Sequence, residues 1–206
     1  ALADIGAIQF GDFTLTSGKK SPIYIDLRIL ASHPQALRQV SRAYARLLRQ
    51  DLGIRPVLPD GNAVGNSHPG GLCLAAIPYA ALPIGTAVAL ETGLPLIYPR
   101  KETRAHGTGR QIEGEYQPGD RAIVLDDLIT TGGSKLAAIE PLEAAGLEVQ
   151  DVVVLIDREQ GGREDLEAAG YQLHSVLRLG QMLDLLAGSG RISRQQREET
   201  LAFLKS

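Results

Sequence analysis

Long apolar runs and cysteines are both scarce in this sequence of 206 residues. No stretch approaches the length of a membrane span and no signal sequence is visible, so we expect no membrane association and a cytoplasmic location. The single cysteine, Cys73, excludes an internal disulfide and favours a reducing compartment. Because Cys73 lies in the apolar run LCLAAI, we expect it to be a packed core thiol rather than a reactive one.

The sequence also lacks a large excess of charge of either sign. It has 21 Lys and Arg against 24 Asp and Glu, which gives a formal net charge of −3. This balance argues against a nucleic-acid-binding protein, although it leaves room for a local basic patch. No internal repeat is visible, and the length predicts one globular domain, or one domain with a small attached lobe, with a sizeable core.

The first residue is Ala, and segment 1–10, ALADIGAIQF, has the pattern of the last turns of a helix. This interpretation places the start of the helix before the start of the sequence. We therefore expect a trimmed start, which means either that the sequence itself was shortened or that a domain was excised from a longer polypeptide.

Short apolar runs alternate with segments of helical periodicity, which predicts an α/β fold with a mainly parallel sheet flanked by helices. The runs predict strands at 21–28, 72–77, 94–98, 121–127, 149–158 and 171–176. The expected helices lie at 34–53, 80–92 and 134–145, directly after 161–162, and twice near the C-terminus, the last over 193–205. Segment 54–71 is rich in Gly, Pro and Asn and is expected to be a long loop.

Ligands of parallel sheets bind beyond the carboxyl ends of the strands. Three segments occupy such positions here: the residues after Ile77, the segment RKETRAHG after the strand at 94–98, and the turn DDLITTGGS after Leu125. All three are unusual in their chemistry, so we expect the functional site where they meet.

The turn over Thr130–Ser134 is suited to an anion. Successive backbone N–H groups and hydroxyls lie at the start of a predicted helix, where unsatisfied donors and the helix dipole favour a phosphate. The turn is not a nucleotide triphosphate loop, because Lys135 follows Ser134 rather than preceding it. The run Gly107–Gly109 lacks the third glycine of a dinucleotide fingerprint.

Two adjacent carboxylates, Asp126 and Asp127, precede this turn. Carboxylates at strand ends bind a metal ion, accept hydrogen bonds from the vicinal hydroxyls of a ribose, or simply support the fold. The turn next to them favours a phosphorylated sugar.

The segment 100–119 is polar, with potential cations and few residues able to anchor it, so we predict a mobile loop. Arg100, Lys101, Arg104 and His106 are its candidate functional cations. A solvated charged loop is the alternative, and the position after a strand end favours a functional role.

Four stretches together resemble a known family. AIVLDDLITTGGS resembles the phosphoribosyl-pyrophosphate binding motif of the type I phosphoribosyltransferases. FGDFTLTSGKKSPIYIDLR, RKETRAHGTG and VLIDREQGG, in this order, resemble orotate phosphoribosyltransferase. IPYAALP and LHSVLRLGQMLDLL make the sequence most similar to the form found as the transferase domain of UMP synthase.

The resemblance implies one phosphoribosyltransferase domain over 1–206, with a core over about 31–157 and a small hood formed by about 1–30 and parts of 158–206. It implies a reaction in which orotate and phosphoribosyl pyrophosphate give orotidine 5′-monophosphate and pyrophosphate. Mg²⁺ is expected to bind through the substrate, with no metal held tightly by protein side chains. A homodimer is implied in which the 100–118 loop acts across the interface, together with a possible fused or associated orotidine monophosphate decarboxylase.

The same resemblance implies roles for individual residues. Those expected to bind phosphoribosyl pyrophosphate are Arg100, Lys101, Arg104, His106, Asp126, Asp127, Leu128, Ile129, Thr130, Thr131, Gly132, Gly133 and Ser134. Those expected to be catalytic are Lys101, Arg104, His106, Asp126 and Asp127. Those expected to bind orotate are Thr130, Arg158, Tyr24 and Ile25.

The sequence departs from the family pattern at several positions. Thr16 and Ala81 stand where many members have lysine, Arg104 replaces a usual lysine, and the insertion at 60–71 is atypical. Two other functions stay open: a regulator that binds a nucleotide or phosphoribosyl pyrophosphate without turnover, and a transferase for another base. A serine hydrolase is disfavoured because Pro69 stands where G-x-S-x-G requires its second glycine.

Overall fold

The computed structural model describes residues 2–14, 18, 20–55, 71–100 and 111–204. Thr16, Lys101, Arg104, His106 and nearly all of the 60–71 insertion therefore lie outside the described residues. None of the helices in the described part of the chain combines the length and apolarity that crossing a membrane requires.

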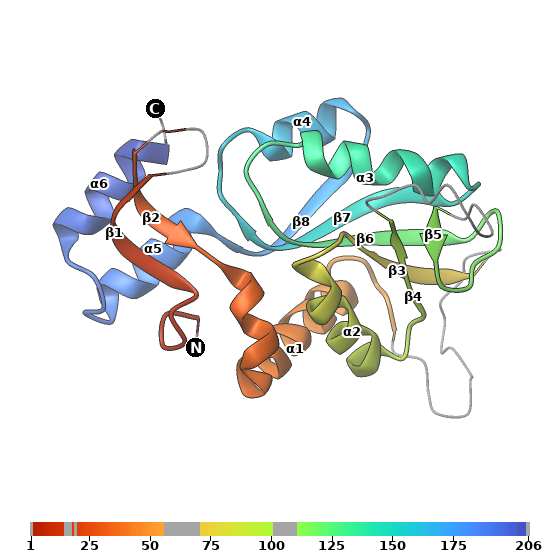
Figure 1. Ribbon diagram of the computed structural model, residues 1–206, viewed down its shortest axis with the longest axis horizontal. Coiled ribbons are helices and arrows are strands. Elements are labelled where there is room, and N and C mark those ends of the chain that lie inside the picture. Colours follow the sequence, from red (N-terminus) through yellow and green to blue (C-terminus); the bar gives the residue numbers. More distant parts are fainter. Residues whose placement is uncertain (1, 15–17, 19, 56–70, 101–110, 205–206) are drawn as a thin grey trace.

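A six-stranded sheet forms the centre of the molecule (Figure 1). Its strands, in spatial order, are β5 (Ile112–Glu113), β4 (Leu96–Pro99), β3 (Leu72–Ala76), β6 (Arg121–Ile129), β7 (Glu148–Asp157) and β8 (Gln172–Arg178). All neighbouring pairs are parallel except β4 and β5. The predicted mainly parallel sheet is confirmed, because continuous apolar runs such as that of β7 are buried from both sides.

Helices cover both faces of this sheet, as Figure 1 shows. One face is covered by α1 (Pro34–Gln50) and α2 (Ala81–Thr92), and the other by α3 (Gly133–Ala144) and α4 (Gly162–Ala168). The start of α1 follows from its sequence, since Pro34 has the fixed φ of a first helical residue. Layers on both faces are the expected solution for a sheet whose strands are apolar throughout.

A second, smaller group of elements lies beside the sheet (Figure 1). It consists of the antiparallel pair β1 (Ile8–Thr14) and β2 (Lys20–Ile25), with α5 (Leu179–Gly188) and α6 (Arg194–Leu204) from the other end of the chain. A 3-10 helix, η1 (Leu27–Ser32), connects β2 to α1. The chain's two ends thus build this group together, while the predicted residue bounds of hood and core stay a prediction.

The N-terminal expectation was wrong in two places. Residues 2–6 form turns rather than the end of a helix, because Gly6 adopts a φ of 75° and β1 begins at Ile8. The strand predicted over 21–28 ends at Ile25, since Asp26 caps η1 by accepting a 3.1 Å hydrogen bond from the backbone N–H of Arg28.

Part of the predicted mobile loop is ordered. Within 111–119, Ile112 is 1% exposed and packs in the core, and the short strand β5 pairs with β4. The backbone N–H of Arg100 also donates to the carbonyl of Gln111 at 2.8 Å. One apolar side chain and a few backbone hydrogen bonds therefore anchor a segment whose composition is polar, whereas 101–110 lie outside the described residues.

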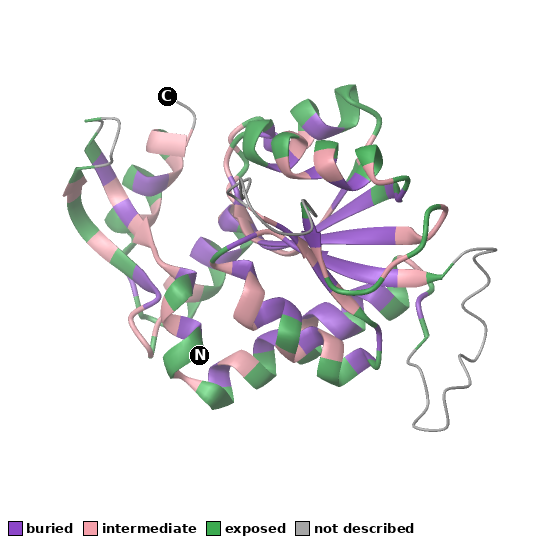
Figure 2. Ribbon diagram, turned by 45° about the vertical axis from the view of Figure 1, so that its right-hand side comes forward, coloured by how far each residue is buried: buried purple, intermediate pink, exposed green. Residues whose placement is uncertain are grey.

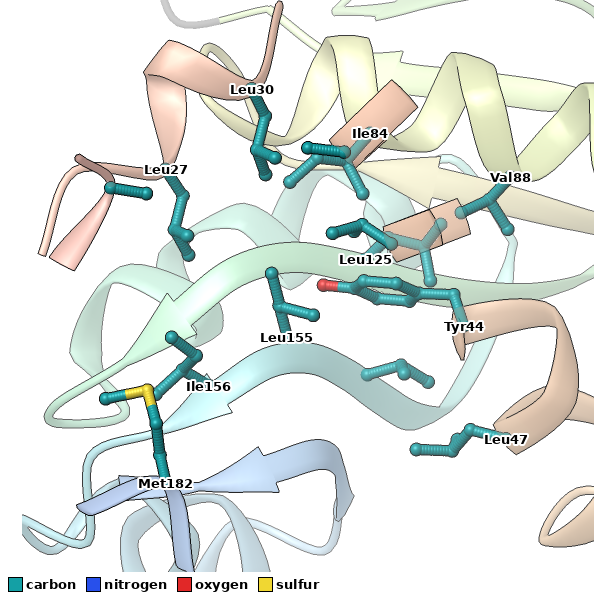
Figure 3. Close-up of a cluster of buried hydrophobic side chains, with 14 of the residues drawn as sticks. Leu27, Leu30, Tyr44, Leu47, Ile84, Val88, Leu125, Leu155, Ile156 and Met182 are labelled. Atoms are coloured by element: carbon teal, nitrogen blue, oxygen red, sulfur yellow. The ribbon is translucent and has the colours of Figure 1, made fainter. Parts of the chain in front are cut away.

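Buried residues concentrate along the sheet strands and on the inward sides of the helices (Figure 2). Figure 3 shows Tyr44 of α1 near Leu125 and Leu155 in the cluster on one face. Cys73 is 3% exposed and belongs to the cluster on the other face. Burial raises the pKa of its thiol to about 12, which confirms the prediction of a packed core thiol.

Candidate active site

The carboxyl ends of the parallel strands meet at one edge of the sheet. Between β3 and β6 the chain order reverses, because β3 leads to β4 on one side and has β6 on its other side. Such a reversal opens a crevice at the strand ends. A cleft of about 590 Å³ lies there, lined by Arg28, Ile77, Pro78, Tyr79, Ala80, Pro99, Arg100, Asp126, Asp127, Ser134, Ala137, Ala138 and Pro141.

The cleft joins the three segments that the sequence singled out: residues after β3, residues after β4, and the end of β6 with the start of α3. Of the predicted site residues, Arg100, Asp126, Asp127 and Ser134 line it. The sequence therefore predicted correctly that these segments come together, although their roles stay predictions.

The two carboxylates at the end of β6 differ in their surroundings. Asp126 is 7% exposed, and its Oδ1 accepts a 2.9 Å hydrogen bond from the backbone N–H of Asp127. Its Oδ2 forms a 2.7 Å ion pair with Nζ of Lys135, which is also buried. Its main-chain carbonyl accepts a 2.6 Å hydrogen bond from the hydroxyl of Tyr44. Three contacts with other parts of the protein thus hold Asp126 in place.

Asp127 is less buried and has fewer partners among the described residues. Its Oδ1 accepts a 2.9 Å hydrogen bond from the backbone N–H of Leu128. Burial, and then the neighbouring charge of Asp126, raise the pKa of Asp127 to about 7. Asp127 therefore binds its proton more tightly than an ordinary aspartate does.

The turn after β6 packs closely against α4, in addition to offering donors to an anion. The backbone N–H of Gly132 donates to Oδ2 of Asp165 in α4 at 2.9 Å. A Cβ atom at Gly132 would lie 2.6 Å from the Cβ of Asp165, so only glycine fits. The backbone N–H of Gly132 is thus engaged by α4, and the contact of Gly132 with phosphoribosyl pyrophosphate stays a prediction.

Other turn positions are more open. Thr131, Gly133 and Ser134 are exposed, and Ser134 lines the cleft. The side chain of Ile129 is buried in the core, and the backbone N–H of Leu128 is taken by Asp127. Exposed Thr131, Gly133 and Ser134 are therefore better placed than Leu128 or Ile129 to meet a ligand.

Two cations line the cleft in the described part of the chain. Arg100 forms an ion pair with Glu113 of β5, which orients the guanidinium at the end of β4. Arg28 also lines the cleft; it was not predicted as a site residue, although it is the last residue of the stretch FGDFTLTSGKKSPIYIDLR. A 2.7 Å ion pair with Asp26 raises the pKa of the Arg28 guanidinium.

Arg158 follows β7 and lies next to the turn, because its backbone N–H donates to the carbonyl of Ile129 at 3.0 Å. Its Nε atom is buried and has no hydrogen-bond partner among the described residues. Burial lowers the pKa of the guanidinium. A buried donor without a partner is costly, which indicates a site for an acceptor.

The loop that carries Arg158 is tied to its surroundings on both sides. Asp157 accepts hydrogen bonds from the backbone N–H of Glu159 at 2.8 Å and from Nη2 of Arg163 at 3.1 Å. Glu159 adopts a φ of 56°, and its Oε2 accepts a 2.7 Å hydrogen bond from the N–H of Gly180. The loop is thereby attached to α5 of the smaller group.

The remaining predicted orotate contacts do not line the 590 Å³ cleft. Tyr24 accepts a 3.2 Å hydrogen bond from Nη2 of Arg28, and its ring centroid lies 5.5 Å from that of Phe13. Ile25 pairs with Ile8 in the small sheet. Arg28 thus links Tyr24 to the cleft, whereas Thr130, Arg158 and Ile25 lie outside its lining.

Across the described residues, no three His, Cys, Asp or Glu side chains are grouped so as to hold a metal ion. Both oxygens of Asp126 already accept hydrogen bonds or an ion pair from the protein. The donor set at the cleft is therefore poor for a metal bound by protein alone, and suits one that brings most of its ligands with the substrate.

Comparisons with known proteins extend this geometry. Residues 27–170 match the family described as the phosphoribosyl transferase domain. The chain is 40% identical over 195 residues to the bifunctional enzyme PyrF/PyrE of Nostoc sp., covering 95% of this chain and 37% of that protein. It is 38% identical over 183 residues to the orotate phosphoribosyltransferase of Pyrococcus abyssi, covering 89% of this chain and 92% of that one.

The fold agrees with these relatives. The solved structure of Leishmania donovani UMP synthase superposes with a TM-score of 0.82 and 43% identity, over 99% of this chain and 40% of that one. The chain thus spans about two fifths of the length of its bifunctional relatives, and nearly the whole of the single-activity one. It belongs to the phosphoribosyl transferase family and, within that family, to the orotate phosphoribosyltransferases.

Proposed function

We propose that this domain transfers a phosphoribosyl group from phosphoribosyl pyrophosphate to orotate, giving orotidine 5′-monophosphate and pyrophosphate. The observation that carries the proposal is the cleft itself, in which the carboxylates of Asp126 and Asp127 lie beside the anion-binding turn at Ser134. A sugar with vicinal hydroxyls and a phosphate needs both groups side by side. Relatives named orotate phosphoribosyltransferase support the choice of base.

The binding of the sugar phosphate follows from the two ends of this arrangement. Carboxylate oxygens accept hydrogen bonds, so Asp126 and Asp127 orient the 2′ and 3′ hydroxyls. Thr131, Gly133 and Ser134 lie at the N-terminus of α3, where open donors and the helix dipole hold the 5′-phosphate. Holding the hydroxyls and the phosphate orients the sugar and thereby positions its anomeric carbon.

In the reaction, the bond from the anomeric carbon to pyrophosphate breaks and a bond to a ring nitrogen of orotate forms. Positive charge grows on the ribose ring, where the negative charge of the carboxylate pair stabilises it. Negative charge grows on the leaving group, which Arg100 and the expected cations Lys101, Arg104 and His106 receive. Each tenfold gain in rate requires about 1.4 kcal/mol of such selective stabilisation.

Mg²⁺ is proposed as the cofactor; it would bind mainly through the substrate and would supply positive charge against the pyrophosphate. The cleft fits this arrangement, because the protein keeps Asp126 engaged with its own donors. Asp127, whose Oδ1 accepts the N–H of Leu128, is the carboxylate more open to the cleft. These residues orient the sugar whether or not they contact the ion.

For the base, we propose Arg158 as the main recognition group. Orotate carries a carboxylate and two carbonyls, all of them acceptors, and the buried Nε of Arg158 lacks an acceptor among the described residues. Thr130, Tyr24 and Ile25 complete this proposed subsite. The hydrogen bonds of Asp157 and Glu159 hold the loop around Arg158 in place.

Three further features belong to the same proposal. The enzyme acts in the cytoplasm and forms a homodimer in which the 100–118 loop reaches across the interface. The domain works fused to, or associated with, an orotidine monophosphate decarboxylase, since relatives that match it include a bifunctional PyrF/PyrE enzyme and UMP synthases.

A substrate screen tests the proposal. The purified domain is given phosphoribosyl pyrophosphate and Mg²⁺ with orotate, uracil or hypoxanthine, and pyrophosphate release is followed. Of the three bases, only orotate is expected to cause pyrophosphate release. Release with another base contradicts the assignment of orotate, and tight binding of phosphoribosyl pyrophosphate without any release supports a regulator instead.

A further inference from the structure

Lys135 is an unusual residue for its position. It lies in the first turn of α3, and its side chain is only 7% exposed. A cation there opposes the helix dipole, and its burial costs solvation free energy. Helix stability therefore does not explain the residue, so its contacts must.

Those contacts connect the two halves of the site. The Nζ atom of Lys135 lies 2.7 Å from Oδ2 of Asp126 and 3.3 Å from Oγ of Ser134. The same ammonium thus contacts one carboxylate of the pair and the anion-binding turn. When Nζ donates to the Ser134 oxygen, the hydroxyl hydrogen of Ser134 stays free to be donated to an anion.

The charge of Lys135 also matters for an anionic ligand. Asp126 and Asp127 place two carboxylates beside each other at a site that has to accept phosphate groups. The ammonium compensates one of these charges without occupying the cleft lining, and it acts to lower the pKa of Asp127.

We propose that Lys135 is a positioning residue for phosphoribosyl pyrophosphate, fixing the carboxylate of Asp126 and keeping the hydroxyl of Ser134 available as a donor. The inference rests on the proposed function and assigns a role to a residue that the phosphate-binding pattern of the turn does not include. Lys135 acts through Asp126 and Ser134 rather than by contact with the reacting atoms.

The test is a set of steady-state assays with Lys135→Met, which keeps the length of the side chain but removes its charge. Loss of a charge-assisted hydrogen bond network predicts a rise of about tenfold in the KM for phosphoribosyl pyrophosphate. The KM for orotate is expected to change less than about twofold, since Lys135 lies on the sugar-phosphate side of the site. Lys135→Arg, which retains the charge, is expected to recover part of the loss.

The pH profile provides a readout that a purely structural lysine would not change. Among the described residues, the charged groups near Asp127 are Asp126 on β6, Lys135 on α3, and Arg28 and Arg100 in the cleft lining; the hydroxyl of Tyr44 binds the carbonyl of Asp126. Removing the ammonium raises the pKa of Asp127, so the acid limb of kcat/KM for phosphoribosyl pyrophosphate moves to higher pH by about 1 unit. Lys135→Arg should leave that limb in place.

Two controls complete the set. Glu140→Gln removes a charge from the exposed side of α3 and should leave both KM values and the pH profile unchanged. Ser134→Ala tests the connection to the turn: if Lys135 acts partly through Ser134, the double variant raises the KM for phosphoribosyl pyrophosphate by less than the product of the single changes.

If Lys135→Met does not fold, because Asp126 is left buried and unpaired, Lys135→Gln keeps a donor without the charge and is predicted to show the same shift of the acid limb. A folded neutral variant with the wild-type KM and an unshifted acid limb overturns the inference. A wild-type domain that shows no turnover of orotate contradicts the proposed function instead.

Discussion

The hydroxyl of Tyr44 in α1 donates a 2.6 Å hydrogen bond to the main-chain carbonyl of Asp126 at the end of β6. Tyr44 is completely buried, and burial, followed by the nearby charges of Asp126 and Asp127, raises the pKa of its hydroxyl. The hydroxyl therefore stays protonated and donates across the neutral pH range. One buried helix residue thus fixes the backbone that carries both candidate carboxylates.

Tyr44→Phe should remove this support. The carbonyl of Asp126 loses its donor in a buried place, so the free energy of unfolding is expected to fall by about 1–3 kcal/mol. Urea denaturation measures the change. Tyr171→Phe is the matched control, because its 3.0 Å hydrogen bond to Glu143 is exposed, and its effect should be much smaller. Equal losses in the two variants would contradict the proposed support.

The two adjacent glycines of the turn should behave differently. In Gly132→Ala the new Cβ meets the Cβ of Asp165 at 2.6 Å, so we expect a loss of about 1–3 kcal/mol in the free energy of unfolding. Nothing lies within 4 Å of a Cβ at Gly133, so Gly133→Ala is the matched control and should change stability by less than about 0.5 kcal/mol. Thermal unfolding measures the stability of both variants. A Gly132→Ala variant as stable as the wild type would show that α4 can shift to make room for the added Cβ.

The raised pKa of Asp127 should make the stability of the fold depend on pH. Its pKa in the folded protein is about 7, above the ordinary value of 3.8, so folding favours the neutral carboxyl. This contribution is fully present below about pH 4 and is lost as the pH rises through 7. Asp127→Asn removes the titration and should be more stable than the wild type at pH 8, by about 1–3 kcal/mol, and similar to it at pH 4. The thermal midpoint of both proteins across this range measures the difference, and parallel curves would contradict the raised pKa.

Substitution of Arg158 should change the KM values of the two substrates to different extents. Arg158→Ala removes the buried donor proposed for orotate, so the KM for orotate should rise by about tenfold or more while that for phosphoribosyl pyrophosphate changes little. Ser134→Ala is the mirror variant and should raise the KM for phosphoribosyl pyrophosphate instead. Initial-rate kinetics with each substrate varied in turn decide the matter, and equal effects of Arg158→Ala on both KM values would count against its assignment.

The parts of the fold that the sequence predicted depend on local patterns. The run AIVLDD indicates a buried strand with charge at its end, and the next residues indicate a turn into a helix; β6 and α3 follow these bounds closely. Because parallel strands end at the same edge, the meeting of Arg100, Asp126 and Ser134 also followed from the order of elements.

The parts that the sequence missed depend on partners far along the chain. Gly132 donates to Asp165, 33 residues away, and Tyr44 reaches Asp126 across 82 residues. The strand β5 forms because Ile112 packs in the core while β5 pairs with β4, although the neighbouring residues in the sequence are polar. No local pattern encodes such pairings, and Arg28 was likewise passed over because its place in the cleft lining appears only once the chain is folded.

Joining a sugar phosphate to orotate in this cleft should consume both substrates together. Orotate loss and pyrophosphate release can be measured in one sample of the wild-type domain with phosphoribosyl pyrophosphate, Mg²⁺ and orotate. We expect one molecule of pyrophosphate for each orotate consumed, and neither change when orotate or phosphoribosyl pyrophosphate is omitted. Pyrophosphate release that does not depend on orotate, or no release at all from the folded domain, would contradict this expectation.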